Sequence, residues 1–136
     1  MNRKEFQQLA AVRLREAKLL LSAKAPDGAY YLAGYVVECA LKACIAKFTQ
    51  RHDFPDKVRV NRSHTHNLND LIGVAGLKDP HVEAMRQSEF AWRWEIVIKW
   101  TEQSRYSTHS AQESSDLIEA IENRQHGILQ WLKKHY

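Results

Sequence analysis

The sequence predicts an all-α protein, an antiparallel bundle of four to five helices in which residues 1–136 form a single domain. The main evidence is the segment 28–48, which is apolar on nearly every face of a helix and is charged only at Glu38, Lys42 and Lys47. Such a helix has to be surrounded by other helices or by lipid. Two charges in its middle argue against a membrane span, so we expect it to form the centre of the bundle.

The second observation is the pair formed by this segment and the helix before it. Asn2 and Glu5 have the spacing of a capping box, and apolar residues then recur along one helical face as far as Lys24. The turn at residues 25–28 contains proline and glycine and is short. Two helices joined by so short a turn are expected to run antiparallel.

The middle of the chain is predicted to be less regular. Residues 49–64 lack periodicity and are rich in charge, so we expect a long loop there. A short helix over residues 68–72 follows, with Asn67 as its cap. The sequence Asp79-Pro80 predicts another helix start, with the aspartate as capping residue and the proline at the first helical position.

The last third contains one ambiguous segment and one clear one. Residues 92–104 alternate in part like a strand, but no second strand is predicted with which they could pair, so we expect a helix. Ser110 and Glu113 form a capping box for the final helix, whose apolar face continues to Leu132.

Composition and charge are those of an ordinary globular protein with a mild basic excess. Apolar residues make up 44% of the chain and charged residues 26%, with a formal net charge of +4. The excess is compatible with a nucleotide or nucleic-acid partner. Cys39 and Cys44 lie on the same predicted helix and are expected to be reduced core thiols, which together with the lack of a signal peptide indicates a cytoplasmic protein.

Three motifs resemble the HEPN family of small helical-bundle proteins: YYLAGYVVECALKA at residues 30–43, THNLNDLI at 65–72 and SRYS at 104–107. The resemblance extends over residues 17–132, and VVECALKA is its most specific part. It implies a helical bundle, a homodimer, and a partnership with a separate small nucleotidyltransferase. Some family members are metal-independent ribonucleases that use an arginine and a histidine with four to six residues between them.

Two arginine–histidine combinations are candidates for that chemistry. Arg59 has the required spacing to both His64 and His66, although all three lie in the predicted middle loop. Arg105 and His109 lie closer to a late helix, but only three residues separate them. In such a site the imidazole would move a proton of the ribose hydroxyl while the guanidinium holds the phosphate.

Arg105 and Tyr106 are the candidate residues for binding a nucleotide or RNA phosphate. They stand just before the capped final helix, whose free N–H groups also attract anions. The alternative is that Arg105 forms an intramolecular ion pair and Tyr106 packs on the bundle. For Glu38 and Lys42, one helical turn apart, a structural ion pair is the better interpretation.

The leading functional hypothesis is a HEPN-like dimer that binds nucleotide or RNA phosphate and works with a nucleotidyltransferase in a toxin–antitoxin type of system, without being catalytic by itself. The alternatives are a metal-independent endoribonuclease and a scaffolding bundle without a ligand site. The dimer is further suggested by the many aromatic residues between Phe90 and Trp100. No metal, cofactor or membrane is expected, because the sequence contains no ligand spacing or phosphate loop typical of them.

Overall fold

The structure is a computed structural model that describes residues 1–51 and 57–136, with side chains described for residues 1–49 and 60–136. It is 75% helical, and the described residues contain no strand, which confirms the all-α prediction. The helices are α1 (Arg3–Ser22), α2 (Pro26–Arg51), α3 (Lys57–Arg62), α4 (Leu68–Val74), α5 (Lys78–Ala84), α6 (Ser88–Ile98), the 3-10 helix η1 (Glu102–Tyr106), α7 (Ala111–Glu122) and α8 (Ile128–Lys133). The prediction of four to five helices is therefore wrong, since the described part alone has eight α-helices.

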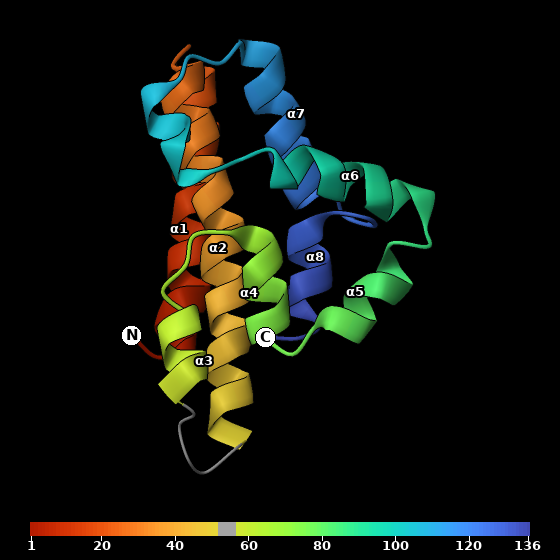
Figure 1. The fold of residues 1–136 in the computed structure, drawn as a ribbon. Coiled ribbons are helices and arrows are strands. Elements are labelled where there is room, and N and C mark those ends of the chain that lie inside the picture. The colour runs from red at the N-terminus through yellow and green to blue at the C-terminus, as the bar shows by residue number, and fades with distance from the viewer. Residues whose placement is uncertain (52–56) are drawn as a thin grey trace.

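Helices α1 and α2 form a long antiparallel pair, as the short turn between them predicts (Figure 1). The Asn2 side chain accepts a hydrogen bond from the Glu5 amide, and the Glu5 carboxylate accepts one from the Asn2 amide, so the predicted capping box is confirmed. The α1 helix ends at Ser22, two residues earlier than predicted, and Lys24 adopts a positive φ of 62° in the turn.

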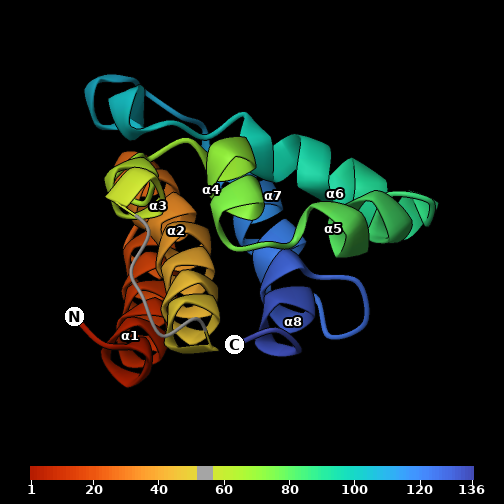
Figure 2. The ribbon, with the colours of Figure 1, turned by 60° about the horizontal axis from the view of Figure 1, so that its bottom comes forward.

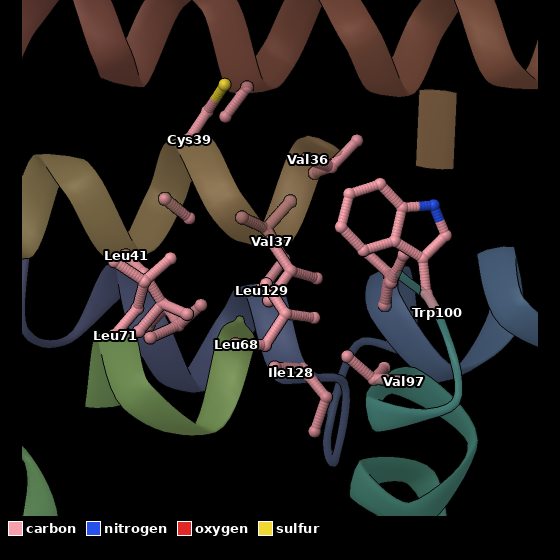
Figure 3. Close-up of a cluster of buried hydrophobic side chains, with 14 of the residues drawn as sticks. Val36, Val37, Cys39, Leu41, Leu68, Leu71, Val97, Trp100, Ile128 and Leu129 are labelled. Atoms are coloured by element: carbon pink, nitrogen blue, oxygen red, sulfur yellow. The ribbon is translucent and has the colours of Figure 1, made fainter. Parts of the chain in front are cut away.

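Helix α2 is the centre of the fold and packs against α1, α4, α7, α8 and η1. Its apolar side chains face every neighbour, and Figure 3 shows several of them in one core cluster with residues from α4, α6 and α8. By length and composition the segment Pro26–Thr49 would be able to cross a membrane, but 72% of its most apolar window is buried. Such burial is typical of the core helix of a soluble protein, in agreement with the predicted role of this segment.

Helices α5 and α6 lie on the side of α7 and α8 that faces away from α1 (Figures 1 and 2). Helix α6 confirms the helical interpretation for residues 92–98 of the segment 92–104, because Trp94 and Val97 point into the core at helical spacing. The α-helix ends at Ile98, residues 99–101 are not helical, and the 3-10 helix η1 follows. Helix α5 begins at Lys78 with Leu77 as its cap, so the prediction that Asp79 caps it is wrong. Proline is tolerated at Pro80 because the first-turn N–H groups have no partner within the helix.

Two predicted segments differ from the structure. Of the predicted loop 49–64, residues 49–51 belong to α2 and residues 57–62 form α3, while residues 52–56 lie outside the described part of the structure. The single final helix is in fact two helices, because the chain turns between Glu122 and Ile128. The turn is stabilised by the Asn123 side chain, whose Oδ1 accepts hydrogen bonds from the backbone amides of Gln125 at 3.1 Å and His126 at 2.9 Å.

The aromatic residues of α6 are mostly internal, which removes one argument for a dimer. Phe90, Trp94 and Trp100 are all less than 5% exposed within one chain. Trp92 remains 43% exposed, and the Arg93 guanidinium stacks 4.3 Å from its ring centroid. The assumption that a single bundle cannot cover these aromatic residues is thus wrong, and the dimer stays a prediction that rests on the family resemblance alone.

Candidate functional site

A buried carboxylate in the central helix is the starting point of a polar cluster. Glu38 is only 4% exposed, and the Lys42 ammonium donates to its Oε1 at 2.9 Å, as the one-turn spacing predicts. The Nδ1 atom of His66 lies 2.9 and 3.1 Å from the two oxygens of the same carboxylate. A buried charge is costly unless it is paired, so these two partners explain how Glu38 is tolerated in an apolar helix.

His66 is held between two carboxylates. Its Nδ1 faces Glu38, while its Nε2 lies 3.4 Å from Oε2 of Glu102 in η1. The side chain of His66 is 39% exposed, so the ring is fixed by the protein and still open to a ligand.

Glu102 also brings Arg105 to this cluster. The Arg105 Nη1 atom lies 3.9 Å from Glu102 Oε1, and the guanidinium carbon lies 4.8 Å from the ring centroid of Tyr106. The side chain of Arg105 is 44% exposed, and Tyr106 is 74% exposed. The structure therefore brings together His66 and Arg105, which come from two different predicted pairs. We call Glu38, Lys42, His66, Glu102 and Arg105 the polar cluster.

Two tyrosines of α2 border the polar cluster. The hydroxyls of Tyr31 and Tyr35 lie 3.1 Å apart, and the Tyr35 ring makes an edge contact with the His66 ring. Burial raises the pKa of Tyr35, and the hydrogen bond with Tyr31 and the nearby charges of Glu38 and Glu102 raise it further. Tyr35 therefore stays neutral at physiological pH and keeps its hydroxyl hydrogen.

Trp100 holds η1, and with it Glu102 and Arg105, against α2. Its indole Nε1 donates to the backbone oxygen of Tyr31 at 3.1 Å, and its ring lies over Gly34. A Cβ atom placed at Gly34 would come within 2.0 Å of two carbons of that ring. Only a residue without a side chain allows so close an approach, which gives Gly34 a specific structural role.

A hollow of about 410 Å³ lies next to the polar cluster, and residues 65–69, Ile98 and residues 100–103 line it. His66 and Glu102 are among these residues, together with Trp100 and Thr101. Ligand pockets in proteins commonly have volumes of roughly 300–1,000 Å³. The hollow is thus large enough for a small phosphate-bearing group beside His66.

Of the predicted catalytic residues, three lie away from the polar cluster or cannot be placed in it. The side chain of Arg59 lies outside the described part of the structure. His64 is exposed and lines a different hollow, with Arg3 and Phe6 of α1. His109 is stacked on Tyr30, with ring centroids 3.7 Å apart.

The start of α7 differs from the anion site that the sequence suggests. Ser110 and Glu113 form the predicted capping box there, with the Ser110 Oγ accepting from the Glu113 amide at 3.0 Å. The His109 amide donates to the Asp27 carboxylate, and His109 Nδ1 lies 3.3 Å from Glu113. Two carboxylates therefore already occupy this helix end, and they disfavour the binding of a further anion there.

Neither metal binding nor thiol chemistry is indicated by the described residues. No group of three His, Cys, Asp or Glu side chains among them is placed to hold a metal ion. Burial raises the pKa of Cys39 to about 11 and that of Cys44 to about 12, so both remain protonated thiols. This agrees with their predicted role as core residues.

Sequence reasoning missed Glu102 and Tyr35. Glu102 stands three residues before Arg105, a spacing that allows an ion pair, and this was the only local signal for it. Tyr35 stands three residues before Glu38, but the sequence around it is equally typical of an aromatic residue in the core. The contact between Glu38 and His66 joins positions 28 residues apart and has no local signal.

Comparisons with known proteins give no match: no family model, no curated protein and no solved structure is significantly similar to this chain.

Proposed function

We propose that the chain is a HEPN-like protein that binds the phosphate of a nucleotide or RNA at the polar cluster, with Arg105 as the main contact. The observation that supports it best is the common attachment of Arg105 and His66 to Glu102. His66 and Glu102 also line an open hollow, and Arg105 stands beside it through its contact with Glu102. The partnership with a separate nucleotidyltransferase in a toxin–antitoxin type of system rests on the sequence resemblance alone. In this proposal the protein is a binding component and is not catalytic by itself.

Arg105 is the cation of the polar cluster that is most available to a phosphate. Glu38 is already paired with Lys42 and His66, so its charge is largely compensated. Glu102 holds Arg105 only at 3.9 Å, which leaves guanidinium N–H groups available to an incoming anion. A guanidinium binds phosphate through two parallel hydrogen bonds, which a single distant carboxylate does not match.

Tyr106 adds a surface on which a base can stack. It is the most exposed large hydrophobic residue of the described part of the chain, and its ring lies beside the Arg105 guanidinium. An exposed aromatic ring next to a cation is the usual arrangement for contacting single-stranded nucleic acid, because base and phosphate are then bound together. This feature favours a nucleotide or single-stranded RNA over free phosphate.

The test compares two arginines in similar ion pairs. Arg105 pairs with Glu102 three residues away at 3.9 Å, and Arg86 pairs with Glu83 three residues away at 3.5 Å on α5. We expect Arg105→Ala to weaken the binding of a short single-stranded RNA by on the order of 1–3 kcal/mol, roughly 5- to 150-fold, and Arg86→Ala to have little effect. Fluorescence anisotropy at fixed salt measures both affinities.

Thermal unfolding of the same variants separates binding from stability. The Arg86 side chain is 74% exposed and the Arg105 side chain 44%, and each forms only a surface ion pair, so both variants should melt within a few degrees of the wild type. Equal affinity of Arg105→Ala and wild type, together with a large fall in melting temperature, would mean that Arg105 is a structural residue.

A second candidate function, metal-independent RNA cleavage, is favoured by one specific observation. The buried Glu38 carboxylate holds His66 by Nδ1, which is the way enzymes orient a histidine that transfers protons through its other nitrogen. We expect that, if RNA is cleaved in the presence of EDTA, His66→Ala abolishes the cleavage while His64→Ala and His109→Ala leave it nearly unchanged. Gel analysis of a labelled RNA measures this.

The result distinguishes catalysis from binding alone. Absence of cleavage by the wild type removes the ribonuclease candidate and leaves the binding proposal intact. Cleavage that survives His66→Ala but is lost in His109→Ala would contradict the assignment of the site to the polar cluster.

A further inference from the structure

An apolar groove with cationic edges lies between α1 and α8, away from the residues of the polar cluster. Its volume is about 420 Å³, and Leu14, Leu19 and Leu129 are among the apolar residues that line it. Leu19 is 62% exposed, the largest exposed fraction of any leucine in the described chain. A single exposed leucine is common, but here it stands at the edge of a continuous apolar surface.

Three cations border the groove: Arg15 and Lys18 from α1 and Lys133 from α8. Lys18 forms an exposed ion pair with Glu122 at 3.0 Å. Among the described residues, Arg15 and Lys133 have no carboxylate within ion-pair distance, and no acidic residue lines the groove. The edges therefore present uncompensated positive charge beside an apolar floor.

The groove has the length of a helix. Its lining residues on α1 run from Gln7 to Ser22, which corresponds to roughly 22 Å along the helix axis. Four turns of a second helix laid alongside would have the same length. Apolar grooves between helices are a recurrent way of binding amphipathic helices, which insert residues at one-turn spacing.

We propose that this groove binds an amphipathic helix of a partner protein, with apolar residues facing Leu14, Leu19 and Leu129 and with Asp or Glu residues facing the two unpaired cations, Arg15 and Lys133. Charge complementarity identifies this partner. A second copy of the chain, bound through the same face, would bring the cations of the two copies together, which is unfavourable. The inference concerns a different surface from the polar cluster and holds whether or not that cluster binds phosphate.

The experiment uses the full chain and a displayed library of 18-residue helices with leucines at one-turn spacing and random flanking residues. We expect the selected helices to be enriched in Asp and Glu at the flanks and to bind with micromolar dissociation constants. Leu19→Glu should weaken the binding of the selected helices at least tenfold. Val82→Glu is the matched control, because Val82 is 55% exposed and lies on α5, outside the groove; it should leave binding unchanged.

Charge reversal provides the second arm. The double variant Arg15→Glu with Lys133→Glu should no longer bind the acid-flanked helices. It should instead bind versions of these helices in which lysine replaces the flanking Asp and Glu residues. All variants change exposed side chains, so circular dichroism should show wild-type melting.

Several results would overturn the proposal. These are the selection of neutral or basic helices, the lack of any enriched helix, and binding that Leu19→Glu does not weaken. Sedimentation that shows self-association abolished by Leu19→Glu, but not by Val82→Glu, would mean that a second copy covers the groove. Binding to phosphatidylserine vesicles that depends on Leu19 would mean that the face is a lipid surface.

Discussion

Gly34→Ala should destabilise the protein by roughly 3 kcal/mol, because the new methyl group has no space. A Cβ atom at this position lies 2.0 Å from two ring carbons of Trp100, and Trp100 is 2% exposed and hydrogen-bonded to the backbone of Tyr31. The ring has to move away from α2, and η1 has to move with it. The free energy of unfolding, measured by urea denaturation, tests this expectation.

Gly73→Ala is the control for this substitution. Gly73 also lies in a helix, but the nearest side-chain atom to its Cβ position is Arg62 Nη2 at 3.8 Å. Alanine favours the helix over glycine by roughly 1 kcal/mol, so this variant should be as stable as the wild type or more so. Equal stability of Gly34→Ala and Gly73→Ala would contradict the close approach of Trp100 to α2.

Leu41→Asp should prevent folding altogether. Leu41 is completely buried in α2 and belongs to the core cluster shown in Figure 3. Burial of an unpaired carboxylate costs several kcal/mol, and loss of the buried leucine side chain destabilises the fold by roughly 2–5 kcal/mol more. The sum is comparable to the whole free energy of unfolding of a typical domain. The far-ultraviolet circular dichroism of the variant should be that of an unfolded chain.

Leu19→Asp makes the same chemical change at a leucine that is 62% exposed on α1. This variant should remain helical, with a melting temperature close to that of the wild type. A cooperative, fully helical Leu41→Asp protein would show that α2 is not the buried centre of the fold.

Features that depend on neighbouring residues were predicted well from the sequence. The capping boxes at Asn2 and Ser110 are confirmed because each joins groups three residues apart, and the same holds for the Glu38–Lys42 pair at one helical turn. The central position of α2 was predictable because its apolar residues occupy every face.

The break of the final helix could not be found from periodicity. Ile121, Ile128 and Leu132 keep a helical spacing across the break, and all three are buried. The information lies instead in Asn123 and Gly127, since a Cβ at Gly127 would lie 2.4 Å from the backbone oxygen of Asn123. A close approach of backbone atoms that leaves no room for a side chain at Gly127 has no effect on the hydrophobic pattern.

The polar cluster was predictable only in part, for a tertiary reason. His66 and Arg105 were both recognised as candidates, but they were assigned to different partners because sequence spacing was the only guide. The structure relates them through Glu102, which lies 36 positions after His66. Contacts between residues so far apart in the sequence depend on how the helices pack. Here they depend on the position of η1 against α2, which the hydrogen bond from Trp100 to the backbone of Tyr31 helps to fix.

The most direct test of the central claim is a nuclear magnetic resonance titration of the isotope-labelled protein with a short single-stranded RNA. If the polar cluster binds phosphate, the largest chemical-shift changes should occur at the amides of residues 65–67 and 102–106 and at the Trp100 indole. Arg105→Ala should suppress these changes. Changes confined to other surfaces, or no change at millimolar RNA, would contradict a phosphate site at Arg105 and His66.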